Sequence, residues 1–118
     1  MQDKIKSIIE WNNKANNNDF NKHLEASMLA EEFAETIVAI KNWDKVEAID
    51  WILDIFWVGI WTLSKMWIDA ETINKCFEEI EKSNYSKFVN WKAMFDETWK
   101  IQKPKTYFKP DLSKFINQ

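Results

Sequence analysis

Glu31-Glu32-Phe33-Ala34-Glu35 and Glu47-Ala48-Ile49-Asp50-Trp51-Ile52-Leu53-Asp54 are two acidic stretches set in apolar sequence. In a helix, residues three and four positions apart are neighbours, so Glu31, Glu32 and Glu35 would share one surface. The same spacing places Glu47, Asp50 and Asp54 on a single stripe. The pattern therefore predicts two helices, each with a line of carboxylates.

Apolar residues around these stretches recur at helical spacing. One helix is predicted over about residues 20–41, with Leu24, Met28, Leu29, Phe33, Ile37 and Ile40 as its apolar positions. A second is predicted over about 45–66; it is apolar nearly all round, which is typical of a buried central helix. Asn42-Trp43-Asp44 separates them, and Asp44 with Glu47 forms a capping-box-like start for the second.

Two further helices are predicted, over about 3–13 and about 70–83. Two prolines, in Lys103-Pro104 and Lys109-Pro110, oppose a helix beyond them. We expect an all-α, four-helix bundle in one domain spanning 1–118. Its helical core would cover about 3–83. An ordered, irregular C-terminal segment, with room for a short hairpin, would cover about 84–118.

Composition excludes several function classes. The net charge is −3 and there is no basic block, so a nucleic-acid partner is not expected. The most apolar run, Trp51 to Leu63, contains Asp54 and is too short to span a bilayer. The single cysteine and the polar N-terminus fit a cytoplasmic protein. A chain this short buries a limited fraction of its surface, so a homodimer or homotetramer is expected.

The carboxylates on the predicted 45–66 helix indicate a cation site. A carboxylate on a buried stripe is costly unless it is paired or bound to a cation. Two antiparallel helices would bring both acidic groups together and offer the oxygen ligands that Mg²⁺ or Mn²⁺ prefers. The alternative is structural: Glu31, Glu32 and Glu35 alone are typical of a solvated helix face, and Glu47 alone is typical of a first helical turn.

The ordered pair of motifs resembles the MazG-like, all-α nucleoside triphosphate pyrophosphohydrolase superfamily, whose signature is E-x-x-E followed by E-x-x-D. Here Glu32-x-x-Glu35 and Glu47-x-x-Asp50 match, and Glu31 extends the first motif. Asp54 resembles an aspartate that precedes an apolar-aromatic run in many members. The second motif could instead be centred there, with Trp51 in the glutamate's place, so both aspartates are kept.

Residues 20–112 resemble in particular a phage and bacterial subfamily related to phosphoribosyl-ATP pyrophosphohydrolase. The similar segments include Ser83-Asn84-Tyr85-Ser86-Lys87-Phe88 and a C-terminal stretch from Lys100 to Leu112. This resemblance implies that Mg²⁺, held by Glu32, Glu35, Glu47, Asp50 and Asp54, lies against a triphosphate. Glu31, Glu32 and Glu35 become candidate catalytic residues. Asn84, Lys87, Lys103 and Lys105 become candidate substrate-binding residues, although each lysine could be an ordinary surface residue.

The resemblance implies hydrolysis of (deoxy)nucleoside triphosphates to monophosphates and pyrophosphate, which would clean the nucleotide pool. Two alternatives remain open: an inactive nucleotide-binding or regulatory helical module, and a phosphoribosyl-ATP pyrophosphohydrolase of histidine synthesis. A di-iron carboxylate bundle usually needs Glu-x-x-His pairs, which the sequence lacks.

Tryptophan usage is unusual, with eight tryptophans and one glycine. Average glycine usage is about 7%. Trp43 and Trp67 follow predicted helix ends, where glycine is the usual left-handed residue, and Trp99 falls in a polar turn. Trp61 and Trp67 also fall on glycines of the subfamily pattern. We therefore hypothesise that UGA codons, read as tryptophan in this sequence, encode glycine in the source organism; the alternative is a protein that is genuinely rich in tryptophan.

Overall fold

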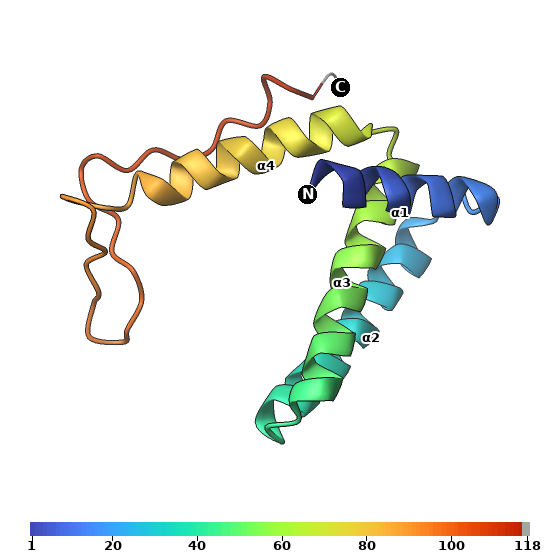
Figure 1. Ribbon diagram of the computed structural model, residues 1–118, viewed down its shortest axis with the longest axis horizontal. Coiled ribbons are helices and arrows are strands. Elements are labelled where there is room, and N and C mark those ends of the chain that lie inside the picture. The colour runs from blue at the N-terminus through green and yellow to red at the C-terminus, as the bar shows by residue number, and fades with distance from the viewer. Residues whose placement is uncertain (117–118) are drawn as a thin grey trace. The chain divides into compact units, whose positions relative to one another are not determined.

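The computed structural model describes residues 1–116 and contains four helices (Figure 1): α1 (Gln2–Lys14), α2 (Lys22–Lys41), α3 (Lys45–Lys65) and α4 (Ala70–Tyr85). Within those residues there is no strand, only two isolated β-bridges. The predicted all-α class is confirmed. The chain divides into two compact units, Met1–Ala70 and the part that begins at Glu71. The single domain over 1–118 stays a prediction.

Helices α2 and α3 are joined by a short turn and form an antiparallel pair. Asn21 starts α2, since its side chain accepts hydrogen bonds from the backbone N–H groups of His23 and Leu24, each 3.1 Å long. Asp44 starts α3 by accepting the Glu47 N–H at 3.1 Å. Each cap satisfies N–H groups that have no partner inside the helix. The predicted N-cap at Asp44 is therefore confirmed.

A buried ion pair joins the beginning of α2 to the end of α3. The Lys65 ammonium lies 2.5 Å from Glu25 Oε1, and the two side chains are only 2% and 3% exposed. The other carboxylate oxygen, Oε2, accepts hydrogen bonds from Trp61 Nε1 at 3.2 Å and from the Thr62 hydroxyl at 3.3 Å. Both oxygens of this buried carboxylate are thus satisfied, which is the condition under which a buried charge is tolerated.

Helix α1 packs on α3 through apolar and aromatic side chains. Ile5 and Ile8 are almost fully buried. The Trp11 ring stacks on Trp61, with centroids 5.9 Å apart, and meets Trp57 edge-on at 5.6 Å. Because such ring pairs add to the gain from burial, they help to fix α1 against the carboxyl-terminal half of α3.

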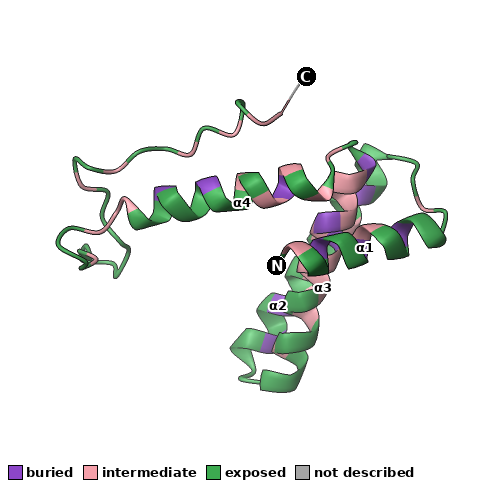
Figure 2. Ribbon diagram, turned by 45° about the horizontal axis from the view of Figure 1, so that its top comes forward, coloured by how far each residue is buried: buried purple, intermediate pink, exposed green. Residues whose placement is uncertain are grey.

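Much of α2 and of the first half of α3 is exposed (Figure 2). The prediction that α3 is a buried central helix is wrong for this half: Val46 is 79% exposed, Ile49 63% and Leu53 60%. On α2, Phe33, Ile37 and Ile40, three of the apolar positions that predicted this helix, are each more than half exposed. The physical reason is that only α2 packs beside this half of α3. A single neighbouring helix buries one side of α3 and leaves the apolar residues on its other sides exposed.

The second unit contains α4 and the C-terminal segment. The Ser83 hydroxyl donates to the Phe108 carbonyl at 2.7 Å. Glu79 accepts the Asp111 N–H at 3.2 Å and pairs with Lys114 at 3.1 Å. These contacts fasten the segment to the helix. On α4, Ile73 is buried, whereas Phe77 and Ile80 are exposed.

The short hairpin expected in the C-terminal segment takes the form of the two isolated bridges, Val89 with Lys92 and Phe95 with Ile101. In the part of the chain that the structure describes, no helix is both long and apolar enough to cross a bilayer. That finding agrees with the sequence-based expectation about the run from Trp51 to Leu63.

Removing one partner of the buried ion pair should destabilise the first unit. Lys65→Met leaves the Glu25 carboxylate buried without its cation, which should lower the free energy of unfolding by about 3–5 kcal/mol. The double variant Glu25→Gln/Lys65→Met keeps an oxygen for Trp61 and Thr62 and should recover most of that loss. Urea unfolding followed by circular dichroism measures both; equal losses in the two variants would show that the ion pair is not the cause.

Candidate active site

The two predicted acidic groups lie on the facing helices α2 and α3. Burial, and then the negative charges of Asp54, Glu35, Glu31 and Asp50, raise the pKa of Glu32 above its ordinary value. Two of those charges are on α3 and two on α2. The α2–α3 packing therefore brings five of the six predicted carboxylates into one electrostatic group centred on Glu32, which we call the carboxylate group.

Glu32 is the least satisfied member of the carboxylate group. Its Oε2 atom is buried, and it has no hydrogen-bond partner within residues 1–116. An unsatisfied buried polar atom costs about 1–3 kcal/mol, and a charged one costs more. Asp54 and Glu35 are half-buried, whereas Asp50 and Glu31 are exposed. The group thus extends from a partly covered centre at Glu32 to solvent.

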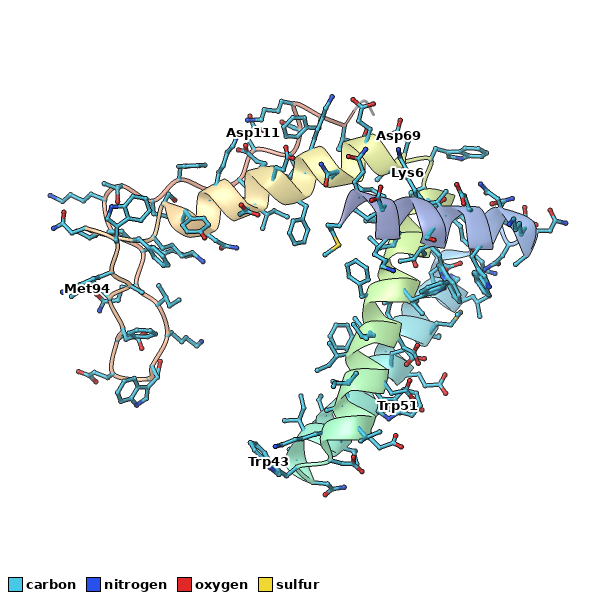
Figure 3. The ribbon with its side chains drawn as sticks, viewed as in Figure 1. Lys6, Trp43, Trp51, Asp69, Met94 and Asp111 are labelled. Carbon is cyan, nitrogen blue, oxygen red and sulfur yellow. The ribbon has the colours of Figure 1, made fainter. Side chains whose placement is uncertain are left out.

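Glu47 lies one turn from the carboxylate group, near the turn between the helices. Together with Glu35, Asp44 and Trp51, it lines a hollow of about 350 Å³ between α2 and α3. Trp51 projects from α3 (Figure 3) and forms part of the wall of this hollow. A bulky ring therefore stands in the position that the alternative reading of the second motif gives to a glutamate.

The donor chemistry of the carboxylate group fits a hard divalent cation, because all its side-chain donors are oxygens. The orphaned Oε2 of Glu32 is consistent with a group that a cation would complete. Among residues 1–116, however, no three acidic, histidine or cysteine side chains stand in a ready-made metal-ligand arrangement. Ligation by Glu32, Glu35, Glu47, Asp50 and Asp54 therefore remains a prediction.

The predicted substrate-binding residues belong to the second unit. Lys87 Nζ donates to Asn84 Oδ1 at 3.2 Å and lies 5.9 Å from the centre of the Tyr107 ring. Lys103 approaches the same ring at 5.2 Å. Lys105 lies on an exposed turn two residues further on. The structure therefore brings together three of the four predicted residues: Asn84, Lys87 and Lys103. It also adds Tyr107, which lies in the C-terminal stretch that carries the resemblance but was not predicted to bind substrate.

Tyr107 could have been found from one signal, an aromatic residue between two Lys-Pro dipeptides. An aromatic ring with two ammonium groups near it within about 6 Å is a cation–π arrangement. Such an arrangement holds lysines in place without neutralising them, so their charge stays available for an anion.

Without metal, the Glu32 titration should make stability depend on pH. Because its pKa is raised above the ordinary 4.5, its favourable contribution is complete below pH 4.5 and is lost as pH rises through the raised pKa. Glu32→Gln removes this loss. In a chelating buffer, the variant should become more stable than the unsubstituted protein as pH rises through that window, with no difference below it. Thermal unfolding from acid to neutral pH measures the effect.

Glu10→Gln on α1 is the control for this prediction, and a parallel shift in that variant would contradict the assignment to Glu32.

Comparison with protein families matches the chain to phosphoribosyl-ATP pyrophosphohydrolase over residues 1–84. Comparison with curated proteins and with solved structures gave no significant match. The matched region includes α1, α2, α3 and all but the last residue of α4, and with them the carboxylate group. It covers well over half of the chain. The chain therefore belongs to the phosphoribosyl-ATP pyrophosphohydrolase family, within the MazG-like all-α superfamily, and is a hydrolase that acts on phosphoanhydride bonds.

Proposed function

We propose that this nucleotide pyrophosphohydrolase converts (deoxy)nucleoside triphosphates to monophosphates and pyrophosphate, as a nucleotide-pool cleaning enzyme. The observation that carries the proposal is the carboxylate group, in which four negative charges surround Glu32 and its buried Oε2 has no partner in the described chain. Such a cluster is unfavourable by itself, and clusters of this kind are concentrated at functional sites. The family match gives the reaction class.

In the proposed site, Glu32, Glu35, Glu47, Asp50 and Asp54 hold Mg²⁺, with Mn²⁺ as the alternative ion. When bound, the ion would neutralise charge on the phosphates and lower the pKa of a water molecule. The protein's own contribution is positioning: α2 and α3 hold the carboxylates on two rigid facing surfaces. Glu31, Glu32 and Glu35 remain the candidates to accept the proton of the attacking water.

The second unit contains the lysines proposed to bind substrate phosphate. Lys87, oriented by Asn84 and Tyr107, is the best-placed candidate for phosphate recognition within that unit. Lys103 shares the ring, and Lys105 adds charge nearby. An ammonium group acts as a point charge on phosphate and needs no fixed angle, which suits an exposed segment.

Phosphoribosyl-ATP is the second candidate substrate, because the matched family is described by that activity. Both candidates contain the same phosphoanhydride link beside a nucleoside, so the carboxylate group cannot separate them chemically. Substrate choice must depend on contacts to base and sugar, for which Asn84 is the one polar candidate named above.

The active form is proposed to be a homodimer or homotetramer in the cytoplasm, with no nucleic-acid partner. Two apolar stripes support self-association: Phe33, Ile37 and Ile40 on α2, and Val46, Ile49 and Leu53 on α3. All six side chains are more than half exposed. Monomeric proteins rarely leave large contiguous apolar patches in water, and a second copy offers the same helices to cover them.

Activity should depend on divalent metal and on the α3 aspartates. Pyrophosphate release is measured for the common nucleoside and deoxynucleoside triphosphates and for phosphoribosyl-ATP, with Mg²⁺, with Mn²⁺ and with chelator. We expect metal-dependent release, and a loss of about 10²-fold or more in Asp50→Asn/Asp54→Asn, as for other charge-stabilising groups. Asp3→Asn/Asp19→Asn makes the same chemical change outside the carboxylate group and should keep full activity.

The outcomes separate the alternatives. Preference for phosphoribosyl-ATP over all triphosphates would replace the pool-cleaning proposal with the second candidate. Tight nucleotide binding by a folded protein that releases no pyrophosphate would indicate the inactive module. Equal loss in both aspartate pairs would show that the effect comes from net charge and not from the carboxylate group.

Self-association should depend on the exposed α3 stripe. The unsubstituted protein should run as a dimer or tetramer in size-exclusion chromatography with light scattering. Ile49→Lys/Leu53→Lys places two charges on the stripe and should give monomers, because burying an unpaired ammonium in an interface is strongly unfavourable. Met66→Lys, at the exposed residue that follows α3, is the control. A monomeric unsubstituted protein would refute the assembly.

A further inference from the structure

Four of the eight tryptophans have a left-handed backbone. The φ angles of Trp43, Trp67, Trp91 and Trp99 are 55°, 65°, 62° and 64°. Their side chains are also the most exposed of the large apolar residues, at 80–90%. Positive φ is uncommon for any residue with a Cβ atom and is a true outlier for a bulky one. Strained backbone and unburied indole thus coincide at the same four positions.

Two of the four lie at helix ends that have the same hydrogen-bond pattern. After α2, the Trp43 N–H donates to the Ile40 carbonyl at 3.0 Å, and the Asp44 N–H donates to the Ala39 carbonyl at 3.0 Å. After α3, Trp67 and Ile68 make the equivalent bonds, to Ser64 and Leu63. This is the Schellman motif, whose left-handed residue is usually glycine. Trp43 and Trp67 occupy that glycine position in both motifs.

The other two lie in hairpin turns. Val89 and Lys92 exchange both backbone hydrogen bonds around Asn90-Trp91, and both central residues have positive φ. Such a two-residue turn is type I′, for which Asn-Gly is the preferred sequence. In the next turn, the Trp99 N–H donates to the Asp96 carbonyl, and Asp96 N–H donates to the Lys100 carbonyl. A left-handed residue after a type I turn forms a bulge that normally uses glycine.

The remaining four tryptophans behave as tryptophans. Trp11, Trp51, Trp57 and Trp61 all lie inside α1 or α3 and have helical backbones. Trp11, Trp57 and Trp61 form one ring cluster, and Trp61 also donates to Glu25. The geometry therefore gives no support for the suspicion raised by the sequence about Trp61, and it adds Trp91 to the suspected set.

We infer that the native protein has glycine at positions 43, 67, 91 and 99, where this chain has tryptophan. Four different turns, two helix-terminal and two in hairpins, each favour glycine, of which the whole chain has only one. The simplest common cause is one codon, UGA, that is read as tryptophan in this sequence and is decoded as glycine in the source organism. The glycine at position 59 would then come from an ordinary glycine codon. The four tryptophans inside helices have a backbone that accepts either residue, so the backbone does not test their codons.

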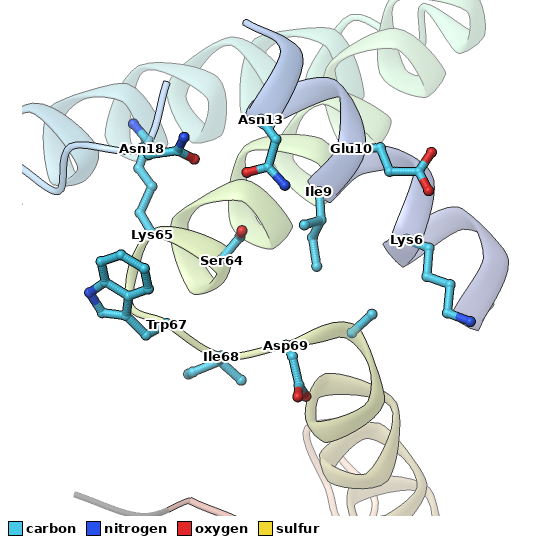
Figure 4. A pocket seen from close by; sticks show the side chains of 11 residues that line it. Lys6, Ile9, Glu10, Asn13, Asn18, Ser64, Lys65, Trp67, Ile68 and Asp69 are labelled. Carbon is cyan, nitrogen blue, oxygen red and sulfur yellow. The ribbon is translucent and has the colours of Figure 1, made fainter. Parts of the chain in front are cut away.

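The inference changes how two surfaces are understood. Trp67 contributes one wall of a hollow of about 460 Å³ in the first unit, beside Asn13, Lys65 and Ile68 (Figure 4). Glycine there removes that wall and opens the hollow. The exposed indoles of Trp91 and Trp99 would otherwise suggest an aromatic docking surface on the C-terminal segment. In the native protein that surface has no indoles.

Peptide mass spectrometry of the protein purified from its source organism tests the inference directly. Glycine masses at positions 43, 67, 91 and 99, with UGA at the corresponding codons, are expected. Tryptophan masses at these positions, or UGG at the four codons, would overturn the inference.

Thermal unfolding of recombinant chains gives an independent test. The variant with Trp43, Trp67, Trp91 and Trp99 all changed to glycine should unfold on the order of 10 °C higher than the unchanged chain, because each change relieves a left-handed backbone. The matched variant with glycine at Trp11, Trp57 and Trp61 should unfold at a lower temperature, because it adds helix-interior glycines and removes packed rings. A lower midpoint in the first variant would contradict the inference.

Discussion

The buried contact between Glu25 and Lys65 is the interaction on which the candidate active site depends. It sets the register of the antiparallel pair by holding the first turn of α2 against the last turn of α3. Glu32 lies about two turns after Glu25, and Asp54 lies about two turns before Trp61, which also binds Glu25. Moving the same distance along both helices brings Glu32 opposite Asp54. Of the four neighbouring charges, that of Asp54 raises the pKa of Glu32 the most. The carboxylate group is thus a consequence of this register.

The α2–α3 pair differs in how it accommodates buried charge at its Glu25 end and in its middle. At one end, every oxygen of Glu25 has a partner, and the contact stabilises the fold. In the middle, Glu32 has an oxygen without a partner and four like charges around it. Stability would favour replacing these carboxylates with neutral residues, so their presence points to a use other than folding. The exposed apolar stripes beside them add a second feature that a single chain leaves unsatisfied.

Local patterns in the sequence predicted the helices well, because periodicity and caps depend on residues a few positions apart. The limits of all four helices and the cap at Asp44 follow from such patterns. Glu25 with Lys65 could not be predicted in this way, because the pair is far apart in sequence and neither residue lies in a motif. The apolar pattern of α3 predicted burial but could not say whether its own chain or another copy provides the cover. The carboxylate spacing predicted which residues share a face, but not that Glu32 alone would be left with an orphaned oxygen.

The turn at Asn42-Trp43-Asp44 connects the question of tryptophan to the question of activity. It reverses the chain between α2 and α3, and its left-handed residue at position 43 lets Asp44 both close α2 and cap α3. A residue that fits this conformation without strain holds the two helices in register from the end opposite the Glu25–Lys65 pair. An indole at position 43 leaves the hydrogen bonds intact but raises the energy of the conformation they require. Strain at this turn acts on the alignment of Glu35 with Glu47, which line the hollow between α2 and α3 together with Asp44. The identity of residue 43 therefore bears on the geometry of the candidate active site.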